Sequence, residues 1–269
     1  MDELPQHLYE RILPLVEASG IHGHLAFVYE MVENRRPGHI YVDQANNPNT
    51  TLVCNDNGFY LAFGRPDETL VRPLVEHFFH LNLRENYTSL LASSPEWMTV
   101  LGRILDPLGA EQFSRLVFAR AARPGQALIP AGFSLEPITE EMGQSILDGT
   151  GTGGYGIANW FIRIAGGPKA YAAPGLGLAF VYQGQIASLC GYCGLSKREA
   201  EMEVGTVPAF QGRGLAPQVS TAFLDQCLAR GLELGYTCDS KNLASIKVAH
   251  KIGFVEVEEI HGYQLYKEN

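Results

Sequence analysis

The segment Gln211-Gly212-Arg213-Gly214-Leu215-Ala216 decides our interpretation of the chain, because of what flanks it. A strand-like run, Met202–Val207, precedes it, and a helix-like run begins near Leu215. Two glycines separated by one residue let the backbone turn tightly and expose several N–H groups, and the start of a helix adds the positive end of its dipole. This combination predicts a site for a pyrophosphate, although a plain strand-to-helix turn has the same pattern.

Length and composition indicate a globular protein. The 269 residues suffice for one large domain or two of ordinary size, and a hydrophobic content of 46% supports a substantial core. We find no apolar run of about 20 residues and no basic-then-apolar leader, so we expect a cytoplasmic protein that does not enter a membrane. The net charge of −9 argues against a nucleic-acid partner and favours a cationic or amine-bearing one.

The five cysteines are expected to be reduced thiols, since their number is odd and the chain shows no secretory features. Cys190 and Cys193 have a spacing seen in metal sites. They lie in a strand-like run, however, where residues three apart point to opposite faces, and no second cluster supplies further ligands. We therefore expect no metal.

Proline and glycine punctuation near the midpoint, Ala121–Gln126 and Ile129–Gly132, indicates a linker between two lobes. We assign residues 1–125 to an N-terminal α/β lobe and residues 132–269 to a second domain. In the first lobe, apolar spacing predicts helices and strands, with a hairpin turn at Asn55–Gly58. The predicted helices are Gln6–Ala18, Ala26–Val32, Glu68–Leu81 and Glu96–Leu105, and the predicted strands are His39–Val42, Thr50–Cys54 and Phe59–Phe63.

The second domain is more regular. Its predicted strands are Ser134–Pro137, Gly177–Tyr182, Gln185–Tyr192, Glu201–Val207, Tyr236–Asp239 and a closing hairpin, Phe254–Ile260 with Tyr263–Tyr266. Its predicted helices are Thr139–Leu147 with Thr139 as N-cap, Asn159–Ala165, a helix from Leu215 that stops by Gly231 or Gly235, and Asn242–Ile252. The glycine-rich loop Gly149–Gly156 lacks the strand and Lys-Ser/Thr pair of a P-loop. It is either a loop on the acceptor side or a flexible connection.

This order of elements resembles the GNAT superfamily of N-acetyltransferases. The run Thr206–Ala216 is similar to that family's acyl-CoA signature, with Gln211, Gly214 and Ala216 at its defining positions. Asn242 stands eleven residues before Gly253-Phe254, as in the family's next helix. The resemblance covers the chain from Phe133 onward. It implies an α+β fold with a mixed, mainly antiparallel sheet flanked by helices, while the N-terminal lobe is either a degenerate copy of that fold or the wall of an acceptor pocket.

The resemblance also implies acetyl-CoA as cosubstrate. By the same resemblance, the pantetheine arm is expected to pair with the strand edge near Thr206 and Val207, and Asn242, helped by Ser245, is expected to bind the arm. The alternatives are an ordinary helix N-cap for Asn242 and a solvated position for Ser245. The residues that the resemblance implies as the pyrophosphate cradle are Gln211, Gly212, Arg213, Gly214, Leu215 and Ala216.

The implied reaction is transfer of an acyl group to a primary amine of a small molecule or peptide. Such a transfer needs a base, and Glu203 and Glu201 lie two apart on one strand and share a face; Glu203 is preferred because it is nearer the acyl end. A pair of solvated carboxylates is the alternative. We expect a monomer or homodimer.

The position of the family's acidic tyrosine is occupied here by Ala249, followed by His250. Tyr263, Cys238 and Ser240 are other candidates for the acid. The missing tyrosine leaves open a noncatalytic acyl-CoA-binding regulatory protein.

Overall fold

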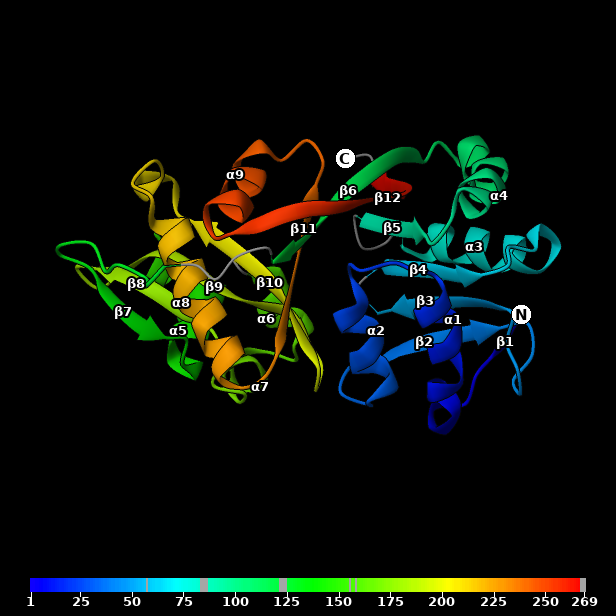
Figure 1. The fold of residues 1–269 in the computed structure, drawn as a ribbon, viewed down its shortest axis with the longest axis horizontal. Helices are drawn as coiled ribbons and strands as arrows, with labels where there is room; N and C mark the ends of the chain where they lie inside the picture. Colours follow the sequence, from blue (N-terminus) through cyan, green and yellow to red (C-terminus); the bar gives the residue numbers. More distant parts are fainter. Residues whose placement is uncertain (57, 83–86, 121–124, 155, 158, 267–269) are drawn as a thin grey trace. The chain divides into compact units, whose positions relative to one another are not determined.

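The computed structural model describes residues 1–269 except 57, 83–86, 121–124, 155, 158 and 267–269. The chain forms two compact units, and we call Met1–Val117 with Glu258–Asn269 unit 1 and Phe118–Val257 unit 2. Two strands, β6 (Glu111–Arg120) and β12 (Phe254–Tyr266), run from one unit into the other (Figure 1). Helices flank mainly antiparallel strands in each unit, which confirms the predicted fold class.

Unit 1 has its strands in the order β1-β2-β3-β4-β5-β12. The bounds are β1 Asp2–Glu3, β2 Gly38–Val42, β3 Thr50–Asn55, β4 Phe59–Gly64 and β5 Tyr87–Ala92. The neighbours are antiparallel except β4 and β5, which are parallel. The end of the chain therefore adds a strand beside β5, and β6 follows β12 in the strand order.

Two hydrophobic clusters hold the helices of unit 1 on this sheet. One joins α1 (Leu13–Ala18), α2 (Leu25–Val32) and a 3-10 helix (Gln6–Ile12) to the strands. The other joins α3 (Glu68–Asn82) and α4 (Pro95–Leu105) to them through buried residues such as Trp97. Because successive residues of a strand point to opposite faces, the strands supply both clusters.

Unit 2 has its strands in the order β11-β10-β9-β8-β7. The bounds are β7 Ser134–Pro137, β8 Leu178–Tyr182, β9 Gln185–Leu195, β10 Glu199–Thr206 and β11 Glu233–Asp239. The pairs β7–β8, β8–β9 and β9–β10 are antiparallel, whereas the pair β10–β11 is parallel. The hairpin between β8 and β9 turns at Gln183-Gly184, both with positive φ, as the sequence predicts.

The helices of unit 2 are α5 (Glu140–Leu147), α6 (Asn159–Ile164), α7 (Pro168–Ala172), α8 (Leu215–Ala229) and α9 (Leu243–Lys251). The hydroxyl of Thr139 accepts a hydrogen bond from the N–H of Met142 at 3.2 Å, so the predicted N-cap of α5 is confirmed. Helix α8 packs on β8, β9 and β10 (Figure 1), with Val219, Phe223 and Cys227 fully buried.

Most predicted elements are confirmed within one to three residues, but the strands β1, β5 and β6 and the helix α7 escaped prediction. The closing hairpin was wrong, because β12 is one continuous strand through His261 and Gly262. Gly262 lies opposite Leu91, and a Cβ there would collide with the carbonyl oxygen of Leu90. Gly262 allows the two strands to approach closely. A His-Gly pair in the sequence is compatible with such a site as well as with a turn, so the sequence alone could not decide between them.

Some predictions fall on residues outside the described part of the chain: Asn57 of the turn Asn55–Gly58, residues 121–124 of the linker, and Tyr155 of the glycine-rich loop. The division into functional domains at residues 125 and 132 stays a prediction. The compact units are divided elsewhere, within β6 and within β12.

Candidate active site

The glycine turn forms an open cradle of N–H groups at the start of α8. Gly212 and Gly214 both have φ of 76°, a conformation that favours glycine. A 3-10 turn, Pro208–Phe210, precedes them, and Gly214 is the N-cap of α8 without any side-chain cap. Within the described residues, the N–H groups of Gly212, Arg213 and Gly214 have no hydrogen-bond acceptor. Unpaired N–H groups at a helix start suit an anion.

The cradle is accessible from solvent. A Cβ built on Gly212 or on Gly214 meets no atom within 4 Å. The side chain of Gln211 donates to the carbonyl of Thr206 at 3.2 Å, which ties the cradle to the end of β10. Arg213 donates to the carbonyl of Ala209 at 3.2 Å, and its guanidinium lies 5.1 Å from the centre of the Phe210 ring. A positive charge is therefore held beside the N–H groups.

The backbone pairing of β10 with β11 ends early, and we call the stretch between the two strands beyond Glu201 and Gly235 the slot. The two strands pair only from Glu199–Glu201 to Glu233–Gly235. Beyond this, Met202–Thr206 remain paired with β9, while Tyr236–Asp239 have no register partner on β10 among the described residues. An edge of β10 that extends beyond its pairing with β11 is the kind of surface to which an extended, peptide-like ligand adds as a strand.

A β-bulge explains why the strands part where they do. The register between β9 and β10 shifts between Glu201 and Met202, and Cys193 of β9 is the extra residue. Its thiol lies 3.6 Å from the carbonyl oxygen of Glu201. Because a bulge bends and twists its ladder, β10 turns away from β11 at the residue where their pairing ends. Cys193 thus has a structural place in the sheet.

At the cradle end of β10, Thr206 and Val207 are fixed to β9. The hydroxyl of Thr206 lies 2.8 Å from that of Ser188, and the N–H of Val207 donates to the carbonyl of Ala187 at 2.9 Å. The side chain of Thr206 is therefore engaged by β9, and its backbone carbonyl by Gln211.

The predicted arm-binding residues lie at the start of α9. Asn242 is the N-cap, and its Oδ1 accepts from the N–H of Ser245 at 3.1 Å. The hydroxyl of Ser245 lies 2.8 Å from that of Tyr236. The capping alternative for Asn242 is thus present in the structure, and Asn242 is an exposed residue. Sequence reasoning missed Tyr236.

The two predicted carboxylates differ in their surroundings. Glu201 is buried, with 5% exposure, and accepts a hydrogen bond from the hydroxyl of Thr237 at 2.7 Å. Glu203 is half-buried and lies farther along β10, beyond the last pair with β11. Residues two apart on a strand share a face, so both carboxylates belong to one side of the slot, and Glu203 is the more accessible.

A third carboxylate belongs to the same strand face and was missed from the sequence. Burial, and secondly the nearby negative charges of Glu201 and Glu233, raise the pKa of Glu199 to about 8. Glu199 is directly opposite Glu233 in the register of β10 and β11. This residue is therefore largely protonated at neutral pH.

The position of the family's tyrosine, the candidate Tyr263 and the nearby Tyr236, which was not predicted, offer no well-placed acid. Ala249 is fully buried and His250 is exposed, with its ring nearly perpendicular to that of Phe118. Burial raises the pKa of Tyr236 well above its usual range, which makes its phenol a weak acid. Tyr263 lies in the core of unit 1, where its hydroxyl accepts from Gln112 at 2.8 Å.

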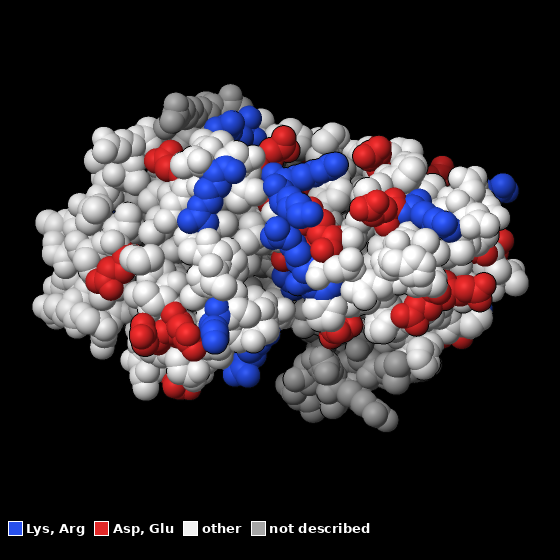
Figure 2. Space-filling model, turned by 90° about the horizontal axis from the view of Figure 1, so that it is seen from below, with Lys and Arg blue, Asp and Glu red and all other residues white. Residues whose placement is uncertain are grey.

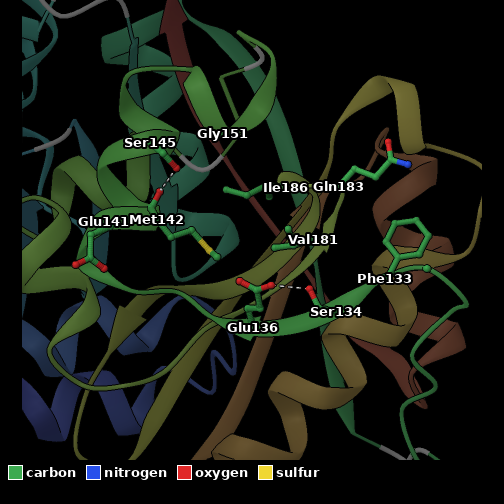
Figure 3. Close-up of a pocket in the computed structure, with 12 residues that line it drawn as sticks. Phe133, Ser134, Glu136, Glu141, Met142, Ser145, Gly151, Val181, Gln183 and Ile186 are labelled. Carbon is green, nitrogen blue, oxygen red and sulfur yellow. Dashed lines mark hydrogen bonds between the residues drawn. The ribbon is translucent and has the colours of Figure 1, made fainter.

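Unit 2 also contains a separate cavity of about 660 Å³ beside β7, β8 and α5 (Figure 3). It is lined by Gly132, Phe133, Ser134, Glu136, Glu141, Met142, Ser145, Gly151, Val181, Gln183, Gly184 and Ile186. Glu136 accepts from the hydroxyl of Ser134 at 2.5 Å. Two carboxylates with no lysine or arginine among these lining residues are unsuited to the phosphates of a coenzyme.

The surface charge is mixed where Figure 2 shows it. Acidic and basic side chains are both spread over that face, with wide uncharged areas between them. In the described part of the chain, no helix is both long and apolar enough to cross a membrane.

Unit 2 thus contains, in chain order, the bulge, the glycine cradle and the capped helix α9, with the slot between β10 and β11. A family profile described as GNAT acetyltransferase matches residues 20–266. The chain belongs to the GNAT acetyltransferase family. It is a GNAT-type N-acetyltransferase, and acyl transfer is the activity of the family, which generally uses acetyl-CoA as cosubstrate.

Relatives agree with this assignment. An uncharacterized N-acetyltransferase of Bacillus subtilis (strain 168), YdfB, is 25% identical over 242 residues, 89% of each chain. Among solved structures, a GCN5-related N-acetyltransferase-like protein from Streptococcus suis has a TM-score of 0.64 at 19% identity, over 95% of this chain and 98% of that one. A tandem GNAT protein from the clavulanic acid biosynthesis pathway has a TM-score of 0.62 at 14% identity, over 100% of this chain and 99% of that one. These structures share the GNAT fold over both units.

Proposed function

We propose that unit 2 binds acetyl-CoA and transfers its acetyl group to a primary amine of a small molecule or peptide. The observation that carries this proposal is that two features follow one another along the chain. The edge of β10 beyond its last pair with β11 leads, through the 3-10 turn Pro208–Phe210, to the open N–H groups of Gly212, Arg213 and Gly214. A peptide-like arm and a pyrophosphate, joined in one molecule, match an edge followed by an anion cradle.

In the proposed reaction Glu203 is the general base. Its carboxylate accepts a proton from the acceptor amine, directly or through one water, and the amine nitrogen forms a bond to the thioester carbonyl carbon. The carbon–sulfur bond then breaks, and the thiolate takes a proton from solvent because Ala249 supplies none. The accessible position of Glu203 beyond the last pair of β10 and β11 supports this role.

We expect a single acyl-CoA site per chain, in unit 2. The corresponding strands of unit 1, β4 and β5, do not part, and the start of its helix α3 offers no open anion cradle. Strands β4 and β5 stay paired through Ala62 and Ala92, and Ser93 adds a further hydrogen bond to Ala62 at 3.1 Å. At the start of α3 the carboxylate of Asp67 accepts from the N–H groups of Thr69 and Leu70. A carboxylate where a phosphate would bind repels it. We therefore interpret unit 1 as a degenerate copy of the fold.

The proposal also covers the cellular location, the oligomeric state and the partner of the protein. All five cysteines are free thiols, which fits the reducing cytoplasm. We propose a cytoplasmic monomer or homodimer acting on an amine rather than on nucleic acid, in line with the net charge of −9.

An assay of CoA release tests the function. Purified protein is incubated with acetyl-CoA and a panel of amines, including polyamines, aromatic amines, amino acids and peptide N-termini, and free thiol is measured. The proposal requires turnover with at least one amine, which is abolished or strongly reduced in Glu203→Gln. Tight binding of acetyl-CoA without turnover on any acceptor favours the noncatalytic regulatory alternative, which the buried Ala249 at the tyrosine position motivates.

A further inference from the structure

The closed end of the slot contains a polar contact that joins the two parting strands. Thr237 of β11 lies two residues beyond Gly235, the last residue paired with β10. Its hydroxyl donates to Oε1 of Glu201 at 2.7 Å, and both residues are buried, with exposures of 8% and 5%. A side-chain hydrogen bond thus continues the connection between the strands one step past the end of their backbone pairing.

Gly235 makes room for this contact. A Cβ at residue 235 would lie 2.6 Å from Oε2 of Glu201, closer than real Cβ contacts allow. One carboxylate oxygen of Glu201 is therefore bonded to Thr237, and the other lies against the backbone of Gly235. We call Glu201, Gly235 and Thr237 the clasp. Helix α8 already ends at Ala229, so the sequence interpretation of Gly235 as a helix stop is replaced by this packing role.

The clasp lies at the end of the slot opposite the cradle. Glu201 precedes Val207 by six strand residues, a rise of about 20 Å at about 3.3 Å for each residue. If the pyrophosphate binds at Gly212–Ala216 and the arm follows β10, the acyl group is the part that points toward Glu201. A longer acyl chain would then have to displace a buried, hydrogen-bonded carboxylate, which is unfavourable for an apolar group.

We propose that the clasp sets the acyl specificity of this enzyme and restricts it to short acyl groups, with Thr237 as the positioning residue that holds Glu201 across the slot. This inference rests on the proposed binding of acyl-CoA in unit 2. It assigns a function to Thr237 and Gly235 that differs from base catalysis, which remains with Glu203.

The test uses binding, so that it does not depend on turnover. CoA, acetyl-CoA and hexanoyl-CoA are titrated by calorimetry into the full chain and into Thr237→Val, which keeps the volume of the side chain but removes the donor. The wild type is expected to bind acetyl-CoA at least tenfold more tightly than hexanoyl-CoA. In Thr237→Val this ratio is expected to fall to threefold or less, with affinity for CoA unchanged within twofold.

Two further variants separate positioning from a general loss of structure. Thr237→Ser keeps the hydroxyl and is expected to restore the discrimination. Thr221→Val is the matched control, because Thr221 is equally buried, at 7%, and donates to the carbonyl of Pro217 at 2.9 Å in α8, away from the clasp. It is expected to keep the wild-type ratio, and thermal unfolding shows whether each variant is folded.

An unchanged ratio in folded Thr237→Val, or equal affinity of the wild type for both acyl-CoAs, overturns the clasp proposal while leaving the proposed function intact. Binding with acyl discrimination but no turnover on any amine contradicts the proposed function alone. A wild type that binds neither CoA nor acyl-CoA contradicts both.

Discussion

Glu201 of β10 lies directly opposite Gly235 of β11, and the carboxylate of Glu201 takes the space that a side chain at residue 235 would need. The pairing of the two strands ends at this position, beside the bulge at Cys193. One glycine and one carboxylate therefore mark the point from which the proposed substrate slot opens.

Replacing Gly235 with alanine is expected to lower stability through this contact. The new Cβ forces the carboxylate of Glu201 to move, and overpacking of this kind costs about 1–3 kcal/mol of unfolding free energy. Urea unfolding measures the loss, and Gly125→Ala, whose Cβ meets no atom within 4 Å, is the control. If the contact with Glu201 causes the loss of stability, Gly235→Ala is expected to lower the unfolding free energy much less in a Glu201→Ala background. Strictly additive effects of the two substitutions would show that this contact is not the cause.

The local parts of the site were predictable from the sequence, because their causes are local. Two glycines between a strand and a helix predict the positive-φ turn at Gly212 and Gly214, and Thr139 caps α5 as its residue type favours. The hairpin turn at Gln183-Gly184 follows from the same kind of reasoning. In each case the interacting groups lie within a few residues of one another.

The clasp was not predictable, because it depends on the register between strands. Thr237 and Glu201 are 36 residues apart, and only the pairing of Glu201 with Gly235 brings them together. The raised pKa of Glu199 has the same origin, since Glu233 lies opposite it. The continuous strand β12 was missed because its partner, β5, is distant in the sequence, at Tyr87–Ala92.

Glu199 should make the stability of the fold depend on pH. Its pKa is raised from 4.5 to about 8 in the folded protein, so the folded state keeps a proton that the unfolded chain loses. This contribution is fully present below about pH 4.5 and is lost as the pH rises toward 8, by on the order of a few kcal/mol.

Thermal unfolding of the wild type and of Glu199→Gln between pH 5 and pH 9 measures this effect. Glutamine keeps the neutral form at every pH, so the variant is expected to lose less stability than the wild type as the pH rises. Parallel curves for the two proteins would mean that Glu199 is not the titrating group.

Asn242 should contribute to both folding and binding. Asn242→Ala removes the N-cap of α9 and is expected to lower the unfolding free energy by about 1 kcal/mol and to weaken acetyl-CoA binding. Asn242→Ser keeps a capping oxygen but removes the amide donor, so stability is expected to hold while affinity falls. Wild-type affinity in Asn242→Ser, measured by calorimetry, would reduce Asn242 to a cap alone.

Glu203→Gln should lower kcat without changing the affinity for acetyl-CoA. Loss of a general base reduces turnover on the order of 10²- to 10⁴-fold, while the cradle and the strand edge stay intact. Glu233→Gln, also on the sheet of unit 2 but on β11, is the control and is expected to keep its kcat. Normal turnover in Glu203→Gln and in Glu201→Gln would exclude both carboxylates as the base.

The glycine cradle is the central feature of the proposed coenzyme site, and titration of acetyl-CoA into Gly214→Val tests its role directly. A residue with a Cβ in the left-handed conformation costs about 1–2 kcal/mol, so the turn is expected to relax and the dissociation constant to rise roughly tenfold. Gly231→Val is the matched control, since Gly231 has φ of 70° and open space at the other end of α8. We expect one site per chain in the wild type, retained in Gly231→Val and weakened in Gly214→Val; equal affinity in all three proteins would contradict the placement of the coenzyme on this turn.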